Sequence, residues 1–391
     1  MEAFGRVLRV PHVTSIFVAA TLGRMPYGIE GLATVLYVQQ ETGSFATAGA
    51  VAASIQVAAG VGLPTLGRVV DIVGQTRVLV PAAWAHLVAG LALIPAVDAE
   101  LPTPLLGALA FVVGFSFPPL SPALRSLWPG VLGADPHLLR SAMAVDAITL
   151  ELVFIGGPLL AAIVIAVASP QAAMVVAYLL CTGGTLAFAA LEPSRRWRGS
   201  GERNRGIGPL RSPGLLTLMA TTALLGVALG ALEVALPAFG IAEDWRSAGP
   251  VAIAALAVGS AVGGLVYGSR PSARLVPSYI AFSAALPLGV ALLALAGPVW
   301  SLIALAPLAG VALAPMTAAA NEIAGRVVPP ETVTEAYAWV VTATILGVAV
   351  GIGVGGAVIE AASWREAILV GAGGGLIGAV VAFAGRRTLT V

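Results

Sequence analysis

The chain contains no lysine and only one cysteine, Cys181, among its 391 residues. A single thiol excludes an internal disulfide, and three scattered histidines, His12, His86 and His137, show no spacing typical of metal ligands. Charged residues make up only 10% of the chain, whereas a soluble domain has about 25%. The formal net charge of +1 gives no electrostatic basis for binding nucleic acid. We therefore expect no metal, no cofactor and no nucleic-acid partner.

Apolar residues dominate what is present. They make up 58% of the chain, and the mean hydropathy of +0.97 indicates a polytopic membrane protein. A helix needs about 20 apolar residues to cross a bilayer, and twelve segments of this kind predict an all-α membrane protein. The segments lie near 13–38, 45–66, 78–97, 103–128, 140–168, 171–191, 213–240, 248–268, 275–297, 299–323, 333–360 and 364–385.

The arginines are distributed unevenly along these segments. If the N-terminus is inside, 17 arginines fall at cytoplasmic ends and loops, Arg246 and Arg365 fall outside, and Arg24 lies within the first segment. Basic residues are enriched on the cytoplasmic side of membrane proteins. The distribution predicts a multi-pass protein of the plasma (inner) membrane with both termini in the cytoplasm.

The stretch from Gly67 to Leu79, GRVVDIVGQTRVL, is a charged interruption between the second and third segments. Gly67 and Gly74 suit a close approach of two helix ends. Asp71 is suited to capping a neighbouring helix, and Arg77 to holding the stretch at the cytoplasmic face.

This stretch resembles the loop between helices 2 and 3 of the major facilitator superfamily, which has the approximate form G-x-x-x-D-R-x-G-R-R. Gly67, Asp71 and Gly74 match, whereas Ile72 and Gln75 stand where the family often has basic residues. The resemblance implies twelve transmembrane helices in two parallel six-helix pseudo-repeats. It also implies a gating loop formed by the three matching residues and Arg77.

Weak internal similarity agrees with a duplication. Shifted by 203 residues, Thr21–Leu32 lies on Leu224–Ala235, which pairs Glu30 with Glu233. We expect three parts: a six-helix bundle at 1–191, a basic and mobile cytoplasmic linker at 192–212, and a second six-helix bundle at 213–391.

Ionisable residues inside a membrane are costly and usually functional. Glu151, near the middle of the fifth segment, is our candidate for proton coupling, with Arg24 as its partner. The alternative is a static Arg24–Glu151 ion pair that only joins two helices. We expect Asp146 to pair with Arg140 or to help close an inner gate. Glu360 lies close to an outer boundary, and we assign it no role.

Glu30 and Glu233 occupy equivalent places in the two halves. We expect both to line the outer part of a central cavity and to attract a cationic or hydroxylated substrate, unless each reaches the surface or caps a helix. Tyr27, Phe115 and Asn321 are further candidates for the cavity. Because amides are few in the spans, an amphiphilic substrate is favoured over a sugar.

The fifth segment contains Gly156, Gly157 and Pro158. This stretch resembles, in its Gly-Pro core, the antiporter motif of drug-exporting members of the family. Proline removes a backbone hydrogen bond, and glycine permits tight contact, which we expect with the other half. We interpret Arg125, at the cytoplasmic end of the fourth segment, as an anchor of an inner loop.

The sequence thus predicts a secondary active transporter rather than an enzyme, since it contains neither a P-loop nor a catalytic constellation. The favoured activity is proton-coupled export of a small amphiphilic drug or metabolite by alternating access, carried out by a monomer in the lipid bilayer. The alternatives are proton-coupled uptake of a sugar or amino acid and, less favoured, a non-transporting membrane sensor of the same fold.

Overall fold

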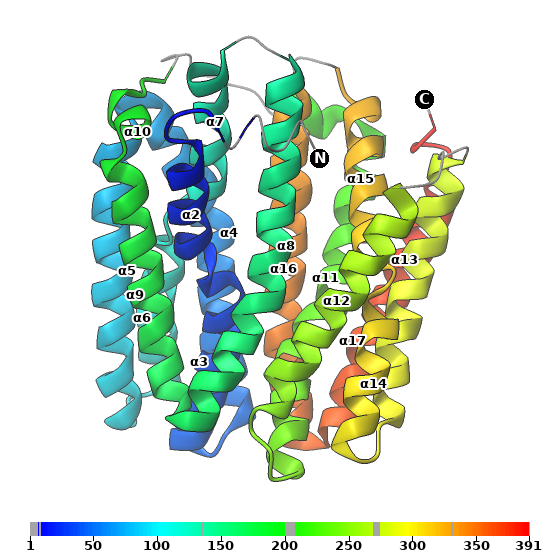
Figure 1. Ribbon diagram of the computed structural model, residues 1–391. Helices are drawn as coiled ribbons and strands as arrows, with labels where there is room; N and C mark the ends of the chain where they lie inside the picture. The colour runs from blue at the N-terminus through cyan, green and yellow to red at the C-terminus, as the bar shows by residue number, and fades with distance from the viewer. Residues whose placement is uncertain are drawn as a thin grey trace.

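The fold is a bundle of long helices that run side by side through the height of the molecule (Figure 1). The computed structural model describes Val7 and residues 9–133, 136–199, 208–268, 274–329 and 332–390, and every regular element in this part of the chain is helical. In a bilayer core there is no water to bond backbone groups, so apolar runs adopt helices, which satisfy those groups internally. The all-α prediction is confirmed.

The N-terminal half forms six spans, two of which consist of two helices each. The break between α2 and α3 lies at Met25, just before Pro26, and the break between α6 and α7 lies at 116–119, where two prolines remove backbone donors. The helices are α2 (Val13–Arg24), α3 (Pro26–Thr42), α4 (Phe45–Val73), α5 (Gln75–Asp98), α6 (Thr103–Phe115), α7 (Leu120–Leu132), α8 (Pro136–Val167) and α9 (Pro170–Ala190).

The C-terminal half repeats this plan. Its fourth span is also broken near the middle, between α14 and α15, as a duplicated six-helix unit predicts. The helices are α11 (Pro213–Ala242), α12 (Ala248–Gly268), α13 (Leu275–Leu292) with η2 (Leu293–Leu295), α14 (Val299–Gly310), α15 (Leu313–Val327), α16 (Val333–Ala361) and α17 (Trp364–Ala384).

The number of spans agrees with the sequence. Eleven stretches of the described chain are long and apolar enough to cross a membrane. The broken pair α2 and α3 supplies a twelfth, because together they extend from Val13 to Thr42. Each of the twelve predicted segments coincides with one of these spans.

The charged stretch that begins at Gly67 is helical rather than a loop. α4 continues to Val73 and α5 begins at Gln75, so Gly74, with a φ of 98°, is the whole connection. Glycine adopts this φ without strain. Gly67 has nothing within 4 Å of its Cβ position, and Asp71 is exposed while α5 begins without a side-chain cap. The predicted close approach at Gly67 and the predicted cap by Asp71 are therefore wrong.

Gln75 has a structural role that accounts for its departure from the family loop. Its side chain is buried, and Nε2 donates to the carbonyl of Ala123 at 2.9 Å and to Oγ of Ser126 at 3.0 Å. These bonds join the start of α5 to α7. A basic side chain here would place a charge in a buried position, at a considerable free-energy cost.

The first part of the predicted linker is folded against the N-terminal half. α10 (Glu192–Arg196) follows α9, and Nε1 of Trp197 donates to a backbone carbonyl of α7 at 3.1 Å. Gly199 lies against Asp71, since a Cβ added to Gly199 would lie 1.8 Å from the carbonyl oxygen of Asp71. The expectation of a mobile spacer is therefore wrong for residues 192–199. Residues 200–207 lie outside the described part, and η1 (Gly208–Arg211) leads into α11.

Close helix crossings depend on glycines, because at these positions the backbone of a neighbouring helix occupies the place that a Cβ would take. At the crossing of α6 with α4, a Cβ on Gly114 would lie 2.0 Å from the carbonyl oxygen of Ile55. Gly107, on the same helix, has nothing within 4 Å. The two glycines therefore form a matched pair for testing the crossing.

We expect Gly114→Ala to destabilise the protein by about 1–3 kcal/mol, because the added methyl group forces α6 away from α4. Gly107→Ala, the control, should leave stability unchanged or slightly raised. The measurement is the thermal unfolding midpoint of the detergent-solubilised protein, followed by tryptophan fluorescence. Equal midpoints for the two variants would contradict the close crossing.

Candidate functional site

A carboxylate joins the two halves at the end of the bundle opposite the start of α2 and the end of α17 (Figure 1). Glu360, near the end of α16, accepts bonds from the N–H groups of Phe45 (2.9 Å) and Ala46 (3.3 Å) and from the Ser44 hydroxyl (3.2 Å). Those N–H groups are the unbonded first donors of α4, at the positive end of its dipole. Ser44 also caps α4 from within its own half, accepting from Thr47 N–H at 3.1 Å. Glu360 thus has a role that the sequence did not reveal.

Other contacts join the halves at the same end. Arg246 donates to Gln40 at 2.7 Å, and the Ser247 hydroxyl donates to the Ala162 carbonyl at 3.0 Å. α4 and α16 also cross closely, since a Cβ on Gly49 would lie 2.8 Å from a carbonyl oxygen of α16. These contacts close the space between the halves at this end.

The two matching glutamates do not face each other. Glu233 of α11 reaches across to the N-terminal half, where Oε2 lies 2.9 Å from the Cβ position of Gly31 and Gln56 is its hydrogen-bond partner. Glu30 is 5% exposed and lies inside the N-terminal half, with Oε2 3.8 Å from Nε2 of His86. Because neighbouring helix residues are about 100° apart, Glu30 and Gly31 point to different sides of α3. The prediction that both glutamates line one cavity is wrong for Glu30.

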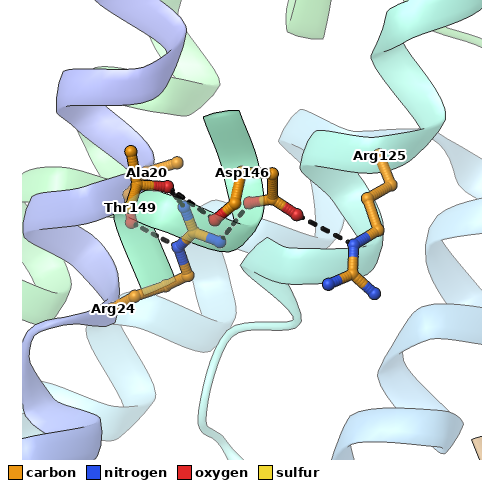
Figure 2. A network of polar contacts seen from close by, with 5 residues as sticks. All are labelled: Ala20, Arg24, Arg125, Asp146 and Thr149. Carbon is orange, nitrogen blue, oxygen red and sulfur yellow. Dashed lines mark hydrogen bonds and ion pairs between the residues drawn. The ribbon is translucent and has the colours of Figure 1, made fainter. Parts of the chain in front are cut away.

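A buried network surrounds Asp146 (Figure 2). Arg24 is fully buried and donates through Nη1 to Asp146 at 2.7 Å, through Nη2 to Thr149 at 3.2 Å and through Nε to the Ala20 carbonyl at 3.1 Å. The second oxygen of Asp146 accepts from Nε of Arg125 at 2.9 Å. One aspartate of α8 therefore holds together α2, α7 and α8.

This network corrects two predictions and leaves a third untested. The partner of Arg24 is Asp146 and not Glu151, because five residues along α8 turn the side chain by about 140° in net rotation. The acidic partner of Arg125 is also Asp146, so Arg125 is more than a loop anchor. The predicted pairing of Asp146 with Arg140 concerns a side chain outside the described part.

The exposed edge of the network carries excess positive charge. Two guanidinium groups share one carboxylate, and the side chain of Arg125 is 52% exposed. Figure 2 shows its two Nη atoms pointing away from Asp146. Arg125 therefore presents two hydrogen-bond donors to a molecule that approaches this edge.

Glu151 lies on α8, a helix that packs against α12 of the C-terminal half. It is half-buried, and it has neither a hydrogen bond nor an ion pair with any residue in the described part of the chain. It shares one stripe of α8 with Pro158 and Ala162, seven and eleven residues further on. The carbonyl of Ala162 accepts a bond from Ser247 of the other half, whereas Pro158 packs on Gly28 of its own half, so this stripe runs along the border between the two halves.

An aromatic cluster lies on the N-terminal half. The ring of Tyr27 stacks on Phe117 at 5.1 Å and on Phe154 at 6.4 Å between centroids. Phe115 stacks instead on a ring of its own helix at 6.3 Å, and Asn321 is exposed on α15. Phe115 and Asn321 therefore do not lie with Tyr27. Phe154 joins the aromatic cluster instead, and the sequence did not reveal it because its position depends on how α8 is rotated.

The glycine-proline stretch of α8 packs within the N-terminal half. A Cβ on Gly157 would lie 2.8 Å from Cα of Gly28, and a Cβ on Gly28 would lie 2.6 Å from Cδ of Pro158. Gly156 has a single side-chain atom near its Cβ position, at 3.9 Å. The predicted tight contact with the other half is therefore wrong, since Gly157 and Pro158 bring α8 against α3.

Basic residues surround the connection between α4 and α5. Arg77, predicted as part of the gating loop, lines a surface pocket with Arg195, Arg198 and Gly74. All three arginines are exposed. This end of the bundle, opposite the Glu360 contact, is the strongly basic one.

Comparison with known proteins identifies relatives along the chain. The model of the Major Facilitator Superfamily matches residues 16–286 and 274–389. An uncharacterized MFS-type transporter, y4rN of Sinorhizobium fredii, is 26% identical over 275 residues, and the match spans 66% of this chain and 66% of that relative. The nucleoside transporter NupG superposes with a TM-score of 0.74 at 16% identity, covering 97% of this chain and 100% of that one. A bacterial homologue of the iron transporter ferroportin in an inward-facing state superposes with a TM-score of 0.73 at 15% identity, covering 97% and 98%. The structural likenesses show a shared fold.

Removing the central carboxylate of the buried network should be costly. In Asp146→Asn the fully buried Arg24 loses its counter-charge, and breaking a buried ion pair from one side costs about 3–5 kcal/mol. We expect a large loss of monodisperse protein in size-exclusion chromatography. The double variant Arg24→Met/Asp146→Leu should recover most of that loss.

The control for this prediction is Glu322→Gln, which breaks an exposed ion pair with Arg326 and should change little. A yield of Asp146→Asn equal to that of the control would show that the network contributes nothing to folding.

Loss of the carboxylate that joins the halves should favour opening at that end. Glu360→Gln removes a charge at a helix N-terminus, worth about 1 kcal/mol, or roughly fivefold in the opening equilibrium. The measurement is the rate at which a soluble maleimide labels Ala53→Cys, which lies next to Gly353 of α16. We expect faster labelling with Glu360→Gln and no change with the exposed control Glu243→Gln. An unchanged rate would show that Glu360 does not hold the halves together.

Proposed function

Because the chain belongs to the Major Facilitator Superfamily, we propose that this transporter exports a small amphiphilic compound in exchange for protons. One observation carries the proposal: Glu233 reaches the opposite half, Glu151 lies on α8 along the border between the halves, and neither has an ion-pair partner in the described part of the chain. Carboxyl groups in such a place can bind and release protons as the halves separate and meet.

The distribution of charge supports an orientation. The end with Arg77, Arg195 and Arg198 is basic and, by the positive-inside rule, is the cytoplasmic end of an inner-membrane protein with both termini inside. The Glu360 contact then closes the outer end. A transporter closed outside exchanges cargo with the cytoplasm, where an exporter binds it.

The side chains between the halves favour an amphiphilic cargo. Phe154 is exposed and stacks on Tyr27, with the buried Phe117 behind it. Arg125 offers donors beside this cluster, since Ser121, one turn before Arg125, bonds Tyr27. Aromatic surfaces with a few fixed polar groups suit ligands with an apolar body and a polar end. The named cargoes of the two structural neighbours, a nucleoside and iron, differ so widely that the fold alone does not select one.

Nutrient uptake by the same carboxyl groups is the second candidate, because direction follows from the gradients and not from the helices. A sensor without transport activity is less favoured, since the departure at Gln75 is explained by its bonds to α7 rather than by loss of a moving part.

The test is transport in liposomes with an acidic lumen. We expect the wild type to accumulate an amphiphilic fluorescent probe while the lumen loses protons, and Glu151→Gln to lose both signals. A cationic probe and an anionic probe of the same size are compared, and Arg125→Gln should reduce movement of the anionic one selectively. The control is Glu100→Gln, an exposed residue beyond the end of α5. Proton-linked movement that persists in Glu151→Gln would remove this residue from the coupling.

A further inference from the structure

A polar cluster is buried inside the N-terminal half, away from the face that meets the other half. Glu30 of α3 and His86 of α5 are 5% and 0% exposed, and their Oε2 and Nε2 atoms are 3.8 Å apart. Within the described chain, His86 is the only group able to carry positive charge that lies within ion-pair distance of Glu30. An unpaired buried carboxylate is very costly, so the state of this pair must limit its charge.

The hydrogen bond on the far side of the imidazole fixes where the proton belongs. Nδ1 of His86 lies 3.0 Å from the carbonyl oxygen of Val113, which can only accept, so Nδ1 carries a hydrogen. In a neutral imidazole Nε2 is then a lone pair directed at Glu30. An ionised Glu30 would place two acceptors against each other with nothing between them. One proton on either group removes that conflict, either as a carboxylic acid facing an imidazole or as a carboxylate facing an imidazolium. The separation of 3.8 Å is too long for a direct hydrogen bond, and Nε2 has no hydrogen-bond partner in the described part of the chain, so the two groups interact through their charges.

From this geometry we propose that Glu30 and His86 form one proton-binding dyad, and that it is a further site, beside Glu151 and Glu233, that the transported proton occupies. The inference rests on the proposed function and identifies residues that bind the proton during transport. In each cycle an O–H or N–H bond forms at the dyad from one side of the membrane and breaks toward the other, without transfer of electrons.

Neighbouring polar atoms fit a path to the dyad. Oε1 of Glu30, Oγ1 of Thr34 and the Tyr178 hydroxyl are buried without a hydrogen-bond partner in the described part of the chain. The ring of Tyr178 meets His86 edge-on at 5.4 Å, and it fits there because Gly90 has no side chain; a Cβ would lie 2.5 Å from the ring. Buried polar atoms are nearly always bonded, so these unbonded atoms leave places where ordered water can bond beside the dyad.

The other titratable groups near the dyad do not compete for its charge. They are Tyr178 and Cys181, both on α9 and both close enough to interact with Glu30. Phenols and thiols are ordinarily neutral at pH 7. Arg24, on the preceding helix, has Asp146 as its ion-pair partner. The dyad therefore titrates as a pair, with macroscopic steps that belong to both residues.

Two direct contacts link the dyad to the face between the halves. Phe117 touches His86 edge-on at 5.1 Å and stacks on Tyr27 at the same distance. On the other side of α3, Gly31 follows Glu30 and meets Glu233 of α11. A cargo at Tyr27 thus acts on the dyad through the ring of Phe117. A movement of α11 acts on it through α3.

The dyad can be tested without transport, because the chain has only three histidines. The protein is labelled with ¹⁵N-histidine, reconstituted in lipid and titrated while the imidazole resonances are followed by NMR. His86→Gln assigns the resonance of His86. We expect Glu30→Gln to shift the titration midpoint of that resonance by about one pH unit or more, while the control His12→Gln, an exposed histidine, leaves it unchanged.

A midpoint for His86 that is the same in the wild type and in Glu30→Gln overturns the dyad. If Glu30→Gln does not fold, Glu30→Asp, which keeps the carboxyl group but moves it back, must shift the midpoint instead. In liposomes, Glu30→Gln should abolish accumulation of the probe driven by a pH gradient yet retain exchange of probe for probe. A coupled titration together with no probe movement in the wild type would refute the proposed export and leave the dyad standing. Accumulation that persists in Glu30→Gln would refute its role in transport.

Discussion

The cost of placing charge inside a bilayer organises this structure. Three arrangements of ionisable side chains meet that cost in different ways. Asp146 lies between two guanidinium groups deep in the N-terminal half. Glu30 faces an imidazole, Glu233 reaches the opposite half, and Glu151 lies at the border between the halves. The first arrangement is balanced by fixed counter-charge and holds helices together, whereas the other two depend on protons or on the position of the halves. This difference separates residues that maintain the fold from those to which we assign a part in the proposed transport cycle.

Glycine sets how closely the elements that carry these charges approach. α3 is in backbone contact with α8 at Gly28 and Gly157, and α4 with α16 at Gly49. In membranes, helix association depends on such close contacts because apolar surface alone gives no driving force there. The first contact keeps Tyr27 beside Phe154, and the second brings the N-terminus of α4 within reach of Glu360. Small residues therefore position the polar ones.

The sequence predicted the architecture better than the site. Twelve apolar runs and the uneven distribution of arginine gave the spans, because length and hydropathy are properties of single helices. The partner of Arg24 and the direction of Glu30 depend on how each helix is rotated against its neighbours, which one sequence does not contain. His86 was overlooked for the same reason: three distant histidines suggest no site until α5 is placed against α3. Gln75 shows the converse, since a departure from a family pattern acquires a meaning only when its hydrogen bonds to α7 are known.

The N-terminus of α4 has two acceptors, one from its own half and one from the other. Ser44 bonds the Thr47 N–H, while Glu360 bonds the N–H groups of Phe45 and Ala46. When the halves part, water replaces Glu360 and Ser44 stays, so the helix keeps its first turn while the contact between the halves is lost. Because Ser44 belongs to the same half as α4, separation of the halves at this end would leave the first turn of α4 capped. A contact of this kind can break and form again repeatedly without fraying of the helix, as alternating access requires.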